Sequence, residues 1–137
     1  LKLLYPQNIH RKEKNIMERV IVRFAIGNRT EFLQTNEDNK YVWSLFMEQA
    51  EGGLPLSEMM EKVVVKLHPT FTPKEIEFNM ANKQSVSLQR TGWGTFRINI
   101  KVVWKGKFNE KESEFHHDLE FVAETRRVVQ TYLTLKK

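Results

Sequence analysis

The segment FRINIKVVWK, residues 96–105, alternates apolar and polar side chains along most of its length. Every second position is apolar, namely Phe96, Ile98, Ile100, Val102 and Trp104. Successive side chains of a β-strand point to opposite faces of a sheet, so this period of two predicts a strand with one buried face. The same alternation predicts strands in FHHDLEFVAE, residues 115–124, and in RRVVQTYLTLKK, residues 126–137.

Three further segments carry strand-like patterns of other kinds. YVWSLFME, residues 41–48, is aromatic and mostly apolar on both faces, which predicts a more central strand. ERVIVRFAIGN, residues 18–28, predicts another strand, which the Gly-Asn turn signal ends. LSEMMEKVVVKL, residues 56–67, has apolar residues at helical spacing, yet its second half is a β-branched run. There we expect a short turn of helix or loop, followed by a strand from about Glu61 to His68.

The spacing of turn residues indicates the fold class. Gly, Pro, Asn and Ser recur at short intervals, at residues 36–39, 52–55, 69–73, 82–85 and 105–109. Many short strands without a long helix are typical of an all-β, antiparallel β-sandwich. A chain of 137 residues is long enough for one such domain. We expect residues 18–137 to form the sandwich and residues 1–17 to be an N-terminal extension.

Composition narrows the class of protein. The apolar runs are only a few residues long, far short of the eighteen or so that span a bilayer, so we expect no membrane partner. The absence of cysteine excludes disulfides and thiolate metal sites. The first residues, LKLLYPQNIHRKEKN, lack the apolar stretch of a secretory signal, which favours the cytoplasm or the nucleus. The net charge of +5 favours polyanions, but the basic residues are scattered, as on an ordinary solvated surface.

Catalytic patterns are missing from the sequence. The four histidines have no zinc-site spacing, and His116 and His117 are sequential, so a strand would point them to opposite faces. The chain contains neither a GxSxG nucleophile motif nor a phosphate-binding loop. We therefore expect no cofactor, no metal site and no enzyme.

Two short motifs stand where strands meet turns. LHPTF, residues 67–71, follows one predicted strand, and TGWGTF, residues 91–96, precedes another. Loops of a sandwich gather at its ends, where binding sites are common. The glycines beside Trp93 remove two side chains, so a ligand can approach the backbone while the indole forms a wall. Taken alone, the motifs are more typical of a tryptophan that caps the core and of a structural histidine.

Several segments, taken in order, resemble the YEATS family of chromatin reader domains: KYVWSLFM, VVVKLHPTF, TGWGTFRINIKVVW and FHHDLEF. VRFAIGNRTEF, ahead of them, resembles the leading strand of that family, so the match covers roughly Val20 to Leu135. The resemblance implies an immunoglobulin-like sandwich whose end loops bind an acylated lysine, acetylated or crotonylated, of a histone tail.

The resemblance also assigns the site. Two loops would form it, and the matching residues are His68, Thr70, Phe71, Gly92, Trp93 and Gly94. Phe71 and Trp93 would enclose the flat acyl amide between their rings. The Thr70 hydroxyl would accept the amide N–H, and the backbone N–H of Trp93 would donate to the acyl oxygen. His68 would brace the loop or contact the aliphatic stem of the ligand.

Three other positions bear on this interpretation. Asp118 matches a family position that can pair with an arginine beside the modified lysine. The chain departs from the family at residues 83–86, where LysGlnSerVal stands in place of a Pro-Pro-aromatic step. It also departs at Tyr41, where the family commonly has histidine. Both departures concern the outer wall of the pocket and its acyl preference.

The first hypothesis is therefore a non-catalytic reader of acylated histone tails, which works in the nucleus as a module of a chromatin-modifying or transcription complex. The second is a β-sandwich scaffold that recruits protein partners through edge strands or a basic face without binding acyl-lysine. A weak contact with DNA through the positive surface is compatible with either hypothesis. A small enzyme is a third hypothesis, and no nucleophile or base pair in the sequence supports it.

Overall fold

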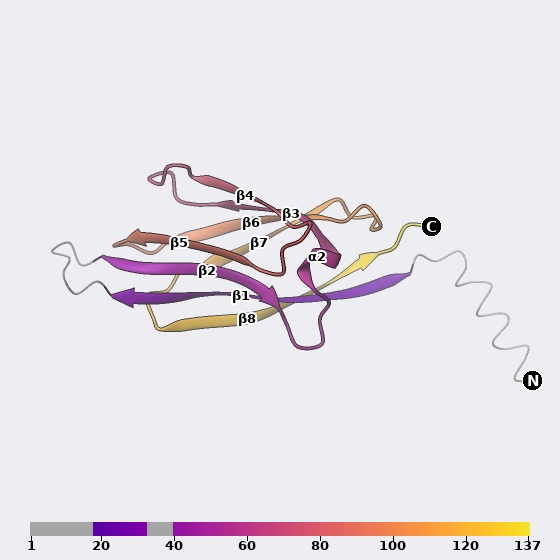
Figure 1. Ribbon diagram of the computed structural model, residues 1–137, viewed down its shortest axis with the longest axis horizontal. Coiled ribbons are helices and arrows are strands. Elements are labelled where there is room, and N and C mark those ends of the chain that lie inside the picture. Colours follow the sequence, from indigo (N-terminus) through magenta and orange to yellow (C-terminus); the bar gives the residue numbers. More distant parts are fainter. Residues whose placement is uncertain (1–17, 33–39) are drawn as a thin grey trace, which may run out of the picture.

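The computed structural model describes residues 18–32 and 40–137, which form two four-stranded antiparallel sheets packed face to face (Figure 1). The first sheet has the order β5-β2-β1-β8, with β1 Arg19–Phe32, β2 Tyr41–Gln49, β5 Val86–Gly92 and β8 Glu124–Thr134. The second has the order β4-β3-β6-β7, with β3 Met60–Lys66, β4 Glu75–Asn79, β6 Arg97–Trp104 and β7 Glu112–Asp118. Among the described residues, the only helical turn is α2, which spans Leu56–Met59 and leads into β3. The predicted all-β sandwich is thereby confirmed.

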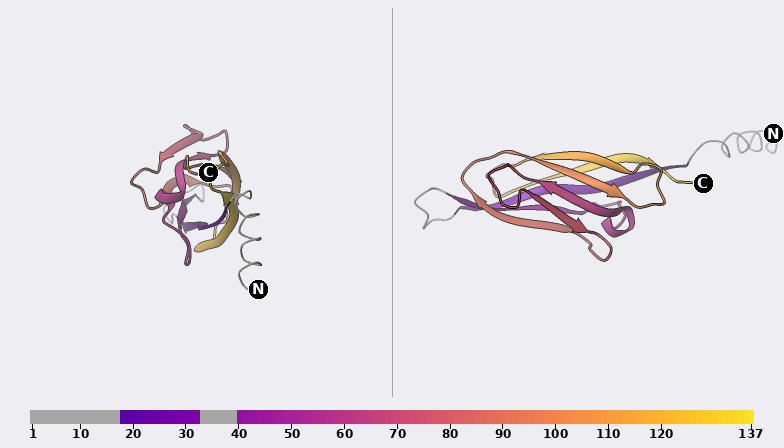
Figure 2. Two further views of the ribbon diagram at one scale, coloured as in Figure 1. Left: turned by 90° about the vertical axis from the view of Figure 1, so that its right-hand side faces the viewer. Right: turned by 90° about the horizontal axis from the view of Figure 1, so that it is seen from above.

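The core lies between the facing sides of the two sheets, which Figure 2 shows from the end and from above. In β6 the predicted alternation is confirmed, because Ile98 and Ile100 are buried while Arg97 and Asn99 are exposed. Each fully buried side chain of this size contributes roughly 1.5–3 kcal/mol relative to an exposed one. The largest fully buried side chains come from both sheets and from α2, and include Trp43, Phe24, Ile26, Leu45, Leu56, Met59, Ile98 and Ile100.

The ambiguous segment 56–67 resolves as expected. Its first part forms the single turn α2, and the β-branched run forms β3, which begins at Met60, one residue before the predicted start. β3 is an inner strand, paired with β4 on one side and β6 on the other. A β-branched run suits a strand that is buried on both sides of its backbone.

The Gly-Asn pair does not end β1, and this prediction was wrong. β1 continues through Gly27 and Asn28 to Phe32. A Cβ at Gly27 would lie 1.9 Å from the carbonyl oxygen of Thr125, so the glycine is there to let β8 approach closely. Asn28 is fully buried and hydrogen-bonded across the sandwich. The pair therefore serves a long-range contact and not a turn.

The boundaries near the C-terminus also differ from expectation. β7 ends at Asp118 and β8 begins at Glu124, so the predicted strand 115–124 contains a turn. The predicted faces are confirmed, since His117 and Leu119 are buried while His116 is exposed. The expected extension, residues 1–17, and the turn residues 36–39 lie outside the described residues. Within the described ranges, no helix is long and apolar enough to cross a membrane.

Three loops gather at one end of the sandwich, on the left in Figure 1. They follow β3 (residues 67–74), join β5 to β6 (93–96) and join β7 to β8 (119–123). The Leu119 N–H donates to the Phe96 carbonyl at 3.1 Å, and the Thr30 N–H donates to the Ala123 carbonyl at 3.2 Å. We call this end the loop end. It carries both motifs that the sequence singled out.

Candidate functional site

The first loop is a compact turn held by its own polar groups. The Phe71 N–H donates to the His68 carbonyl at 3.0 Å. The Thr70 N–H donates to Nδ1 of His68 at 3.2 Å, and the Thr70 hydroxyl lies 2.9 Å from the same nitrogen. Both contacts are satisfied when Nδ1 is unprotonated and the hydroxyl donates to it. The two lone pairs of the Thr70 hydroxyl oxygen then remain able to accept a further hydrogen bond.

Four rings pack together beneath this turn, and we call them the aromatic cluster: Trp43, His68, Phe71 and Phe96. The centroid of the Phe71 ring lies 5.5 Å from that of Phe96 and 6.0 Å from that of Trp43. Trp43 is fully buried, Phe71 and Phe96 are half-buried, and His68 is exposed. The burial of the cluster thus decreases from the core to the surface, and the Phe71 ring lies at the surface of the loop end.

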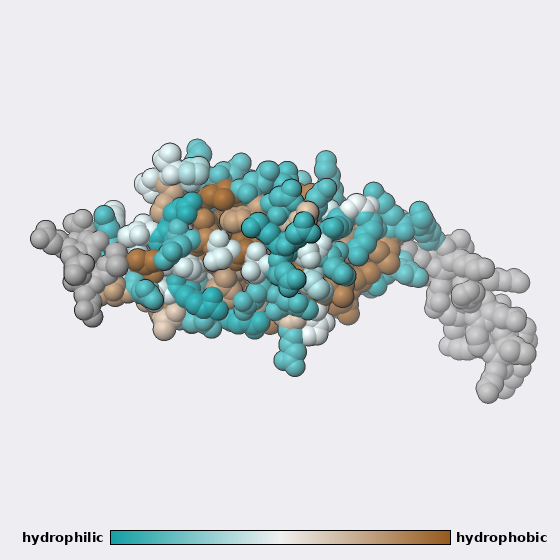
Figure 3. Space-filling model, in the orientation of Figure 1, coloured by the Kyte–Doolittle hydropathy of each residue, from teal (hydrophilic) through white to brown (hydrophobic). Residues whose placement is uncertain are grey.

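The second loop presents a tryptophan to solvent. Trp93 is 74% exposed, so it does not cap the core. Among the described residues it is the most exposed large hydrophobic side chain. Figure 3 shows hydrophobic surface among polar atoms at the loop end. Trp93 is therefore available as one wall of a site.

The glycines on either side of Trp93 keep space open. The only glycine with positive φ among the described residues is Gly52, so neither Gly92 nor Gly94 is needed for its backbone conformation. A Cβ at Gly94 would have no atom within 4 Å. A Cβ at Gly92 would lie 3.5 Å from Nε1 of Trp43 and 3.8 Å from Cζ of Phe71. The two loops therefore meet at Gly92 and Phe71.

Asp118 lies at the end of β7, at the loop end, and already has a cationic partner. Its Oδ1 accepts from Nε of Arg97 at 2.8 Å, and its Oδ2 lies 3.3 Å from a terminal nitrogen of the same guanidinium. This hydrogen bond holds the pKa of Asp118 below its ordinary value and raises the pKa of Arg97. Both side chains are well exposed. Any other arginine that binds Asp118 must compete with Arg97.

A second group of rings flanks the site and was not predicted. Tyr41 is the cross-strand partner of Gly92. Its ring stacks on that of Phe121, with the ring centroids 4.2 Å apart. The centroid of the Phe32 ring lies 5.1 Å from that of Tyr41. Tyr41 thus occupies the position where the family commonly has histidine and packs there against Phe121. The sequence shows that both positions are aromatic, but nothing in it indicates that they lie close together.

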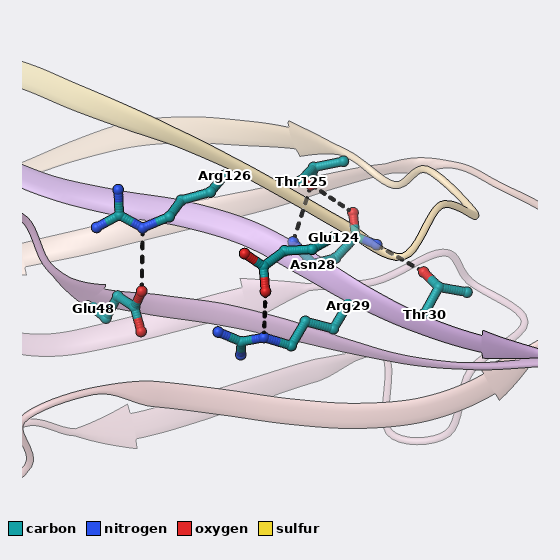
Figure 4. A network of polar contacts seen from close by, with 7 residues as sticks. All are labelled: Asn28, Arg29, Thr30, Glu48, Glu124, Thr125 and Arg126. Carbon is teal, nitrogen blue, oxygen red and sulfur yellow. Dashed lines mark hydrogen bonds and ion pairs between the residues drawn. The ribbon is translucent and has the colours of Figure 1, made fainter.

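A buried polar network lies further into the sandwich and joins its two sheets. Oδ1 of Asn28 accepts from Nε2 of His117 at 2.7 Å, from the Thr125 hydroxyl at 3.1 Å and from the Glu120 N–H at 3.3 Å. Its Nδ2 donates to the Glu120 carbonyl at 2.8 Å and to the Thr30 hydroxyl at 3.0 Å. We call these residues the Asn28 network. Figure 4 shows part of it, beside the surface ion pairs Arg29–Glu124 and Arg126–Glu48.

His117 is the titratable side chain of the Asn28 network. Burial lowers the pKa of His117, and the nearby charge of Arg127 lowers it further. Its Nε2 carries the proton that Asn28 accepts, since an amide oxygen has no proton to donate. Within residues 18–32 and 40–137, no group of three or more histidine and carboxylate side chains is placed to hold a metal ion. What the structure shows of His117 is its hydrogen bond to Asn28, which joins the two sheets.

Comparison with known proteins relates this chain to one family. The sequence model described as "YEATS family" matches residues 38–123. "Protein AF-9 homolog" of Kluyveromyces lactis is 35% identical over 83 residues, which are 61% of this chain and 36% of the relative. The chain thus spans about a third of the length of that curated relative.

Solved structures show the same sandwich. The Yaf9 YEATS domain recognizing an H3K122suc peptide is 26% identical, with a TM-score of 0.70 and coverage of 86% of each chain. The crystal structure of the yeast AF-9 homolog protein Yaf9 is also 26% identical, with a TM-score of 0.72 over 87% of this chain and 82% of the other. Since the family match covers more than half of the residues, this chain belongs to the YEATS family.

Proposed function

We propose that the chain is a non-catalytic reader that binds an acylated lysine of a histone tail between its two loops. The observation that carries the proposal is the exposed indole of Trp93, 74% open, beside the point where Gly92 meets Phe71. A similar domain, Yaf9, recognizes an acylated histone peptide, H3K122suc, which supports the proposal. The bound lysine lies with its amide plane between the rings of Phe71 and Trp93.

The polar groups of the two loops match an acyl-lysine amide. That amide is neutral and flat, with one N–H donor and one carbonyl acceptor. The Thr70 hydroxyl, which is held by His68, accepts the amide N–H. The backbone N–H of Trp93 donates to the acyl oxygen. Gly92 and Gly94 leave room for this approach, and stacking on the two rings contributes roughly 1–3 kcal/mol.

The same arrangement rejects unmodified lysine. An ammonium carries three donors and no acceptor, so it cannot pair with a backbone N–H that points toward it. Stripping an ion of its water without a charged partner costs several kcal/mol. The attraction of a cation to an aromatic face is smaller than that penalty. A planar unsaturated acyl group such as crotonyl extends the stacking and is expected to bind more tightly than acetyl.

Three further features concern the rest of the histone peptide, the cellular role and DNA. Asp118 contacts an arginine of the histone tail once Arg97 releases it. The names of the relatives, AF-9 homologs, support a nuclear module of a chromatin-modifying or transcription complex. A weak, salt-sensitive DNA contact accompanies this role, because the chain carries a net charge of +5.

A titration with histone-tail peptides tests the proposal. Unmodified, acetylated and crotonylated lysine peptides are compared on the wild type and on Trp93→Ala. We expect a clear preference for the acylated peptides, which disappears in Trp93→Ala. Tyr132→Ala, which removes another half-exposed aromatic on the outer face of the first sheet, serves as the matched control and should bind normally. Equal weak binding of all three peptides, untouched by Trp93→Ala, would reject the reader.

The alternative is a protein-interaction scaffold, which one observation favours. Ile21 and Tyr132 are cross-strand neighbours on β1 and β8, and both are about half exposed, as is nearby Val128. Exposed apolar groups side by side on a sheet are typical of a contact surface. If the reader fails its titration, loss of partner capture in Tyr132→Ala would support the scaffold.

A further inference from the structure

One buried polar group at the loop end lacks a partner. Nε1 of Trp43 is inaccessible to solvent and finds no hydrogen-bond acceptor among the described residues. The whole side chain is 0% exposed. Buried donors in folded proteins are nearly always paired, and leaving one unpaired costs about 1–3 kcal/mol. An unpaired indole N–H in a core therefore needs an explanation.

The other buried tryptophan shows that the fold can satisfy such a group. Trp104 is 2% exposed, and its Nε1 donates to the Ser113 hydroxyl at 2.8 Å. Both tryptophans lie on inward faces of strands, one in each sheet. The difference between them is position, since Trp43 belongs to the aromatic cluster and Trp104 lies near the opposite end of the sandwich.

The surroundings of the unpaired N–H belong to the candidate site. The rings of Phe71 and Phe96 meet the indole edge to face, at 6.0 and 5.9 Å between centroids. The glycine that comes closest is Gly92, where a Cβ would lie 3.5 Å from Nε1. Besides Nε1, that Cβ would meet only Cζ of Phe71 within 4 Å, apart from the immediate chain neighbours of Gly92. A gap of about one methyl group thus separates the N–H from the two loops.

We propose that Trp43 is a further ligand-binding residue of this site, and that its indole N–H donates a hydrogen bond to the acyl oxygen of the bound lysine. The inference rests on the proposed function. A carbonyl oxygen has two lone pairs, so it can accept from the Trp43 indole and from the Trp93 backbone together. Both donors lie next to Gly92. The Trp93 N–H belongs to the peptide group that follows Gly92, and the Trp43 indole lies on the side where a Cβ of residue 92 would point.

The inference gives Gly92 and Phe71 separate tasks. Gly92 lacks a side chain because a methyl group would fill the gap between the indole and the ligand. The ring of Phe71 borders that gap and is only half-buried, so its rotation exposes the indole N–H to the entering ligand. The ligand then completes the hydrogen bonding of a donor that the protein leaves open. A weak N–H contact with a ring face is the competing explanation, and it predicts no change on binding.

Replacement of the N–H by sulfur tests the proposal without removing the ring system. Trp43→benzothienylalanine is compared with Trp104→benzothienylalanine, and urea unfolding confirms that each variant folds. At position 43 we expect binding of the acylated peptide to weaken about two- to tenfold, the range for one neutral hydrogen bond. At position 104 we expect wild-type affinity and lower stability, because Ser113 loses its donor. Wild-type affinity at position 43 would overturn the inference.

A glycine pair and an NMR measurement make the test independent of the analogue. Gly92→Ala makes only ordinary contacts and should fold, yet bind the acylated peptide at least tenfold more weakly, whereas Gly106→Ala, with open space around it, should bind normally. The indole proton of Trp43 should shift downfield on binding while that of Trp104 stays in place. A Trp43 signal that does not move would overturn the inference. If the wild type prefers no acylated peptide, both proposals fail, whereas an acyl preference with an inert Trp43 leaves the reader intact.

Discussion

Two neighbouring regions of the sandwich handle buried polar groups in opposite ways. In the Asn28 network, the side-chain amide accepts three hydrogen bonds and donates two, so the inner faces of β1, β7 and β8 are fixed relative to one another. In the aromatic cluster, the Trp43 N–H is unpaired among the described residues, and nearby Trp93 stands in solvent. A fully paired network rigidifies a fold, whereas an unpaired buried donor calls for an explanation, of which a bound ligand is one.

The largest expected difference between the two regions is the effect on stability of replacing Gly27 or Gly94 by alanine. At Gly27 a Cβ would lie 1.9 Å from the Thr125 carbonyl oxygen and 2.6 Å from Cζ of Phe46, so Gly27→Ala must push the backbone of β8 away. We expect a loss of about 3 kcal/mol or more in the free energy of unfolding, measured by urea denaturation. Gly94→Ala has open space and should change that free energy by about 0.5 kcal/mol at most. Equal losses in the two variants would contradict the comparison.

The loss of folding stability at acidic pH tests the Asn28 network. The pKa of His117 lies below its ordinary 6.5, first because of burial and then because of Arg127 and His116, against the opposing charge of Asp118. The unfolded chain therefore binds this proton at a higher pH than the folded chain does. The contribution to stability is complete above pH 6.5 and is lost as the pH falls toward the lower folded pKa.

Urea unfolding at several values between about pH 8 and pH 5 measures this loss. His117→Gln keeps a donor for Asn28 and removes the titration, so its stability should depend less on pH over the same interval. An unchanged pH dependence in His117→Gln would show that other groups cause the loss.

The smallest expected effect concerns the ion pair beside the site. Arg97→Gln removes the cation that occupies Asp118 and should leave the fold intact, because both side chains are well exposed. We expect an acylated peptide with a neighbouring arginine to bind roughly two- to fivefold more tightly, as exposed ion pairs are weak. The same peptide with glutamine in place of the arginine is the control and should gain nothing. Equal gains for both peptides would exclude competition between the two arginines.

The sequence predicted features that depend on local pattern. The alternation in residues 96–105 marked one face of β6 as buried, and the segment 56–67 was divided into helix and strand almost as observed. The short strands β4 and β5, at the edges of their sheets, were not identified, because a few alternating residues give a weak signal. Gly27 was misread as part of a turn, since its reason is a contact with Thr125, which lies far along the chain.

The site was predicted in part for the same reason. The two loop motifs meet at one end of the sandwich, with Phe71 close to Gly92. What the motifs could not indicate is strand register, which places Arg97 opposite Asp118 and Tyr41 opposite Gly92. Nor could they show that Trp43 lacks a hydrogen-bond acceptor, because that depends on every side chain around it. Their roles in binding remain predictions that the titrations above address.

The pairing of Arg19 with Thr134 has a consequence for how the domain is carried. β1 begins and β8 ends at the same pole of the sandwich, on the right in Figure 1, whereas the loops that meet at Gly92 occupy the other pole. The two strand ends and the proposed binding loops are thereby separated by the length of the strands. A linker joined to either strand end therefore lies away from the loops and does not block a peptide that approaches them. A label attached beyond Thr134 likewise leaves the loops accessible.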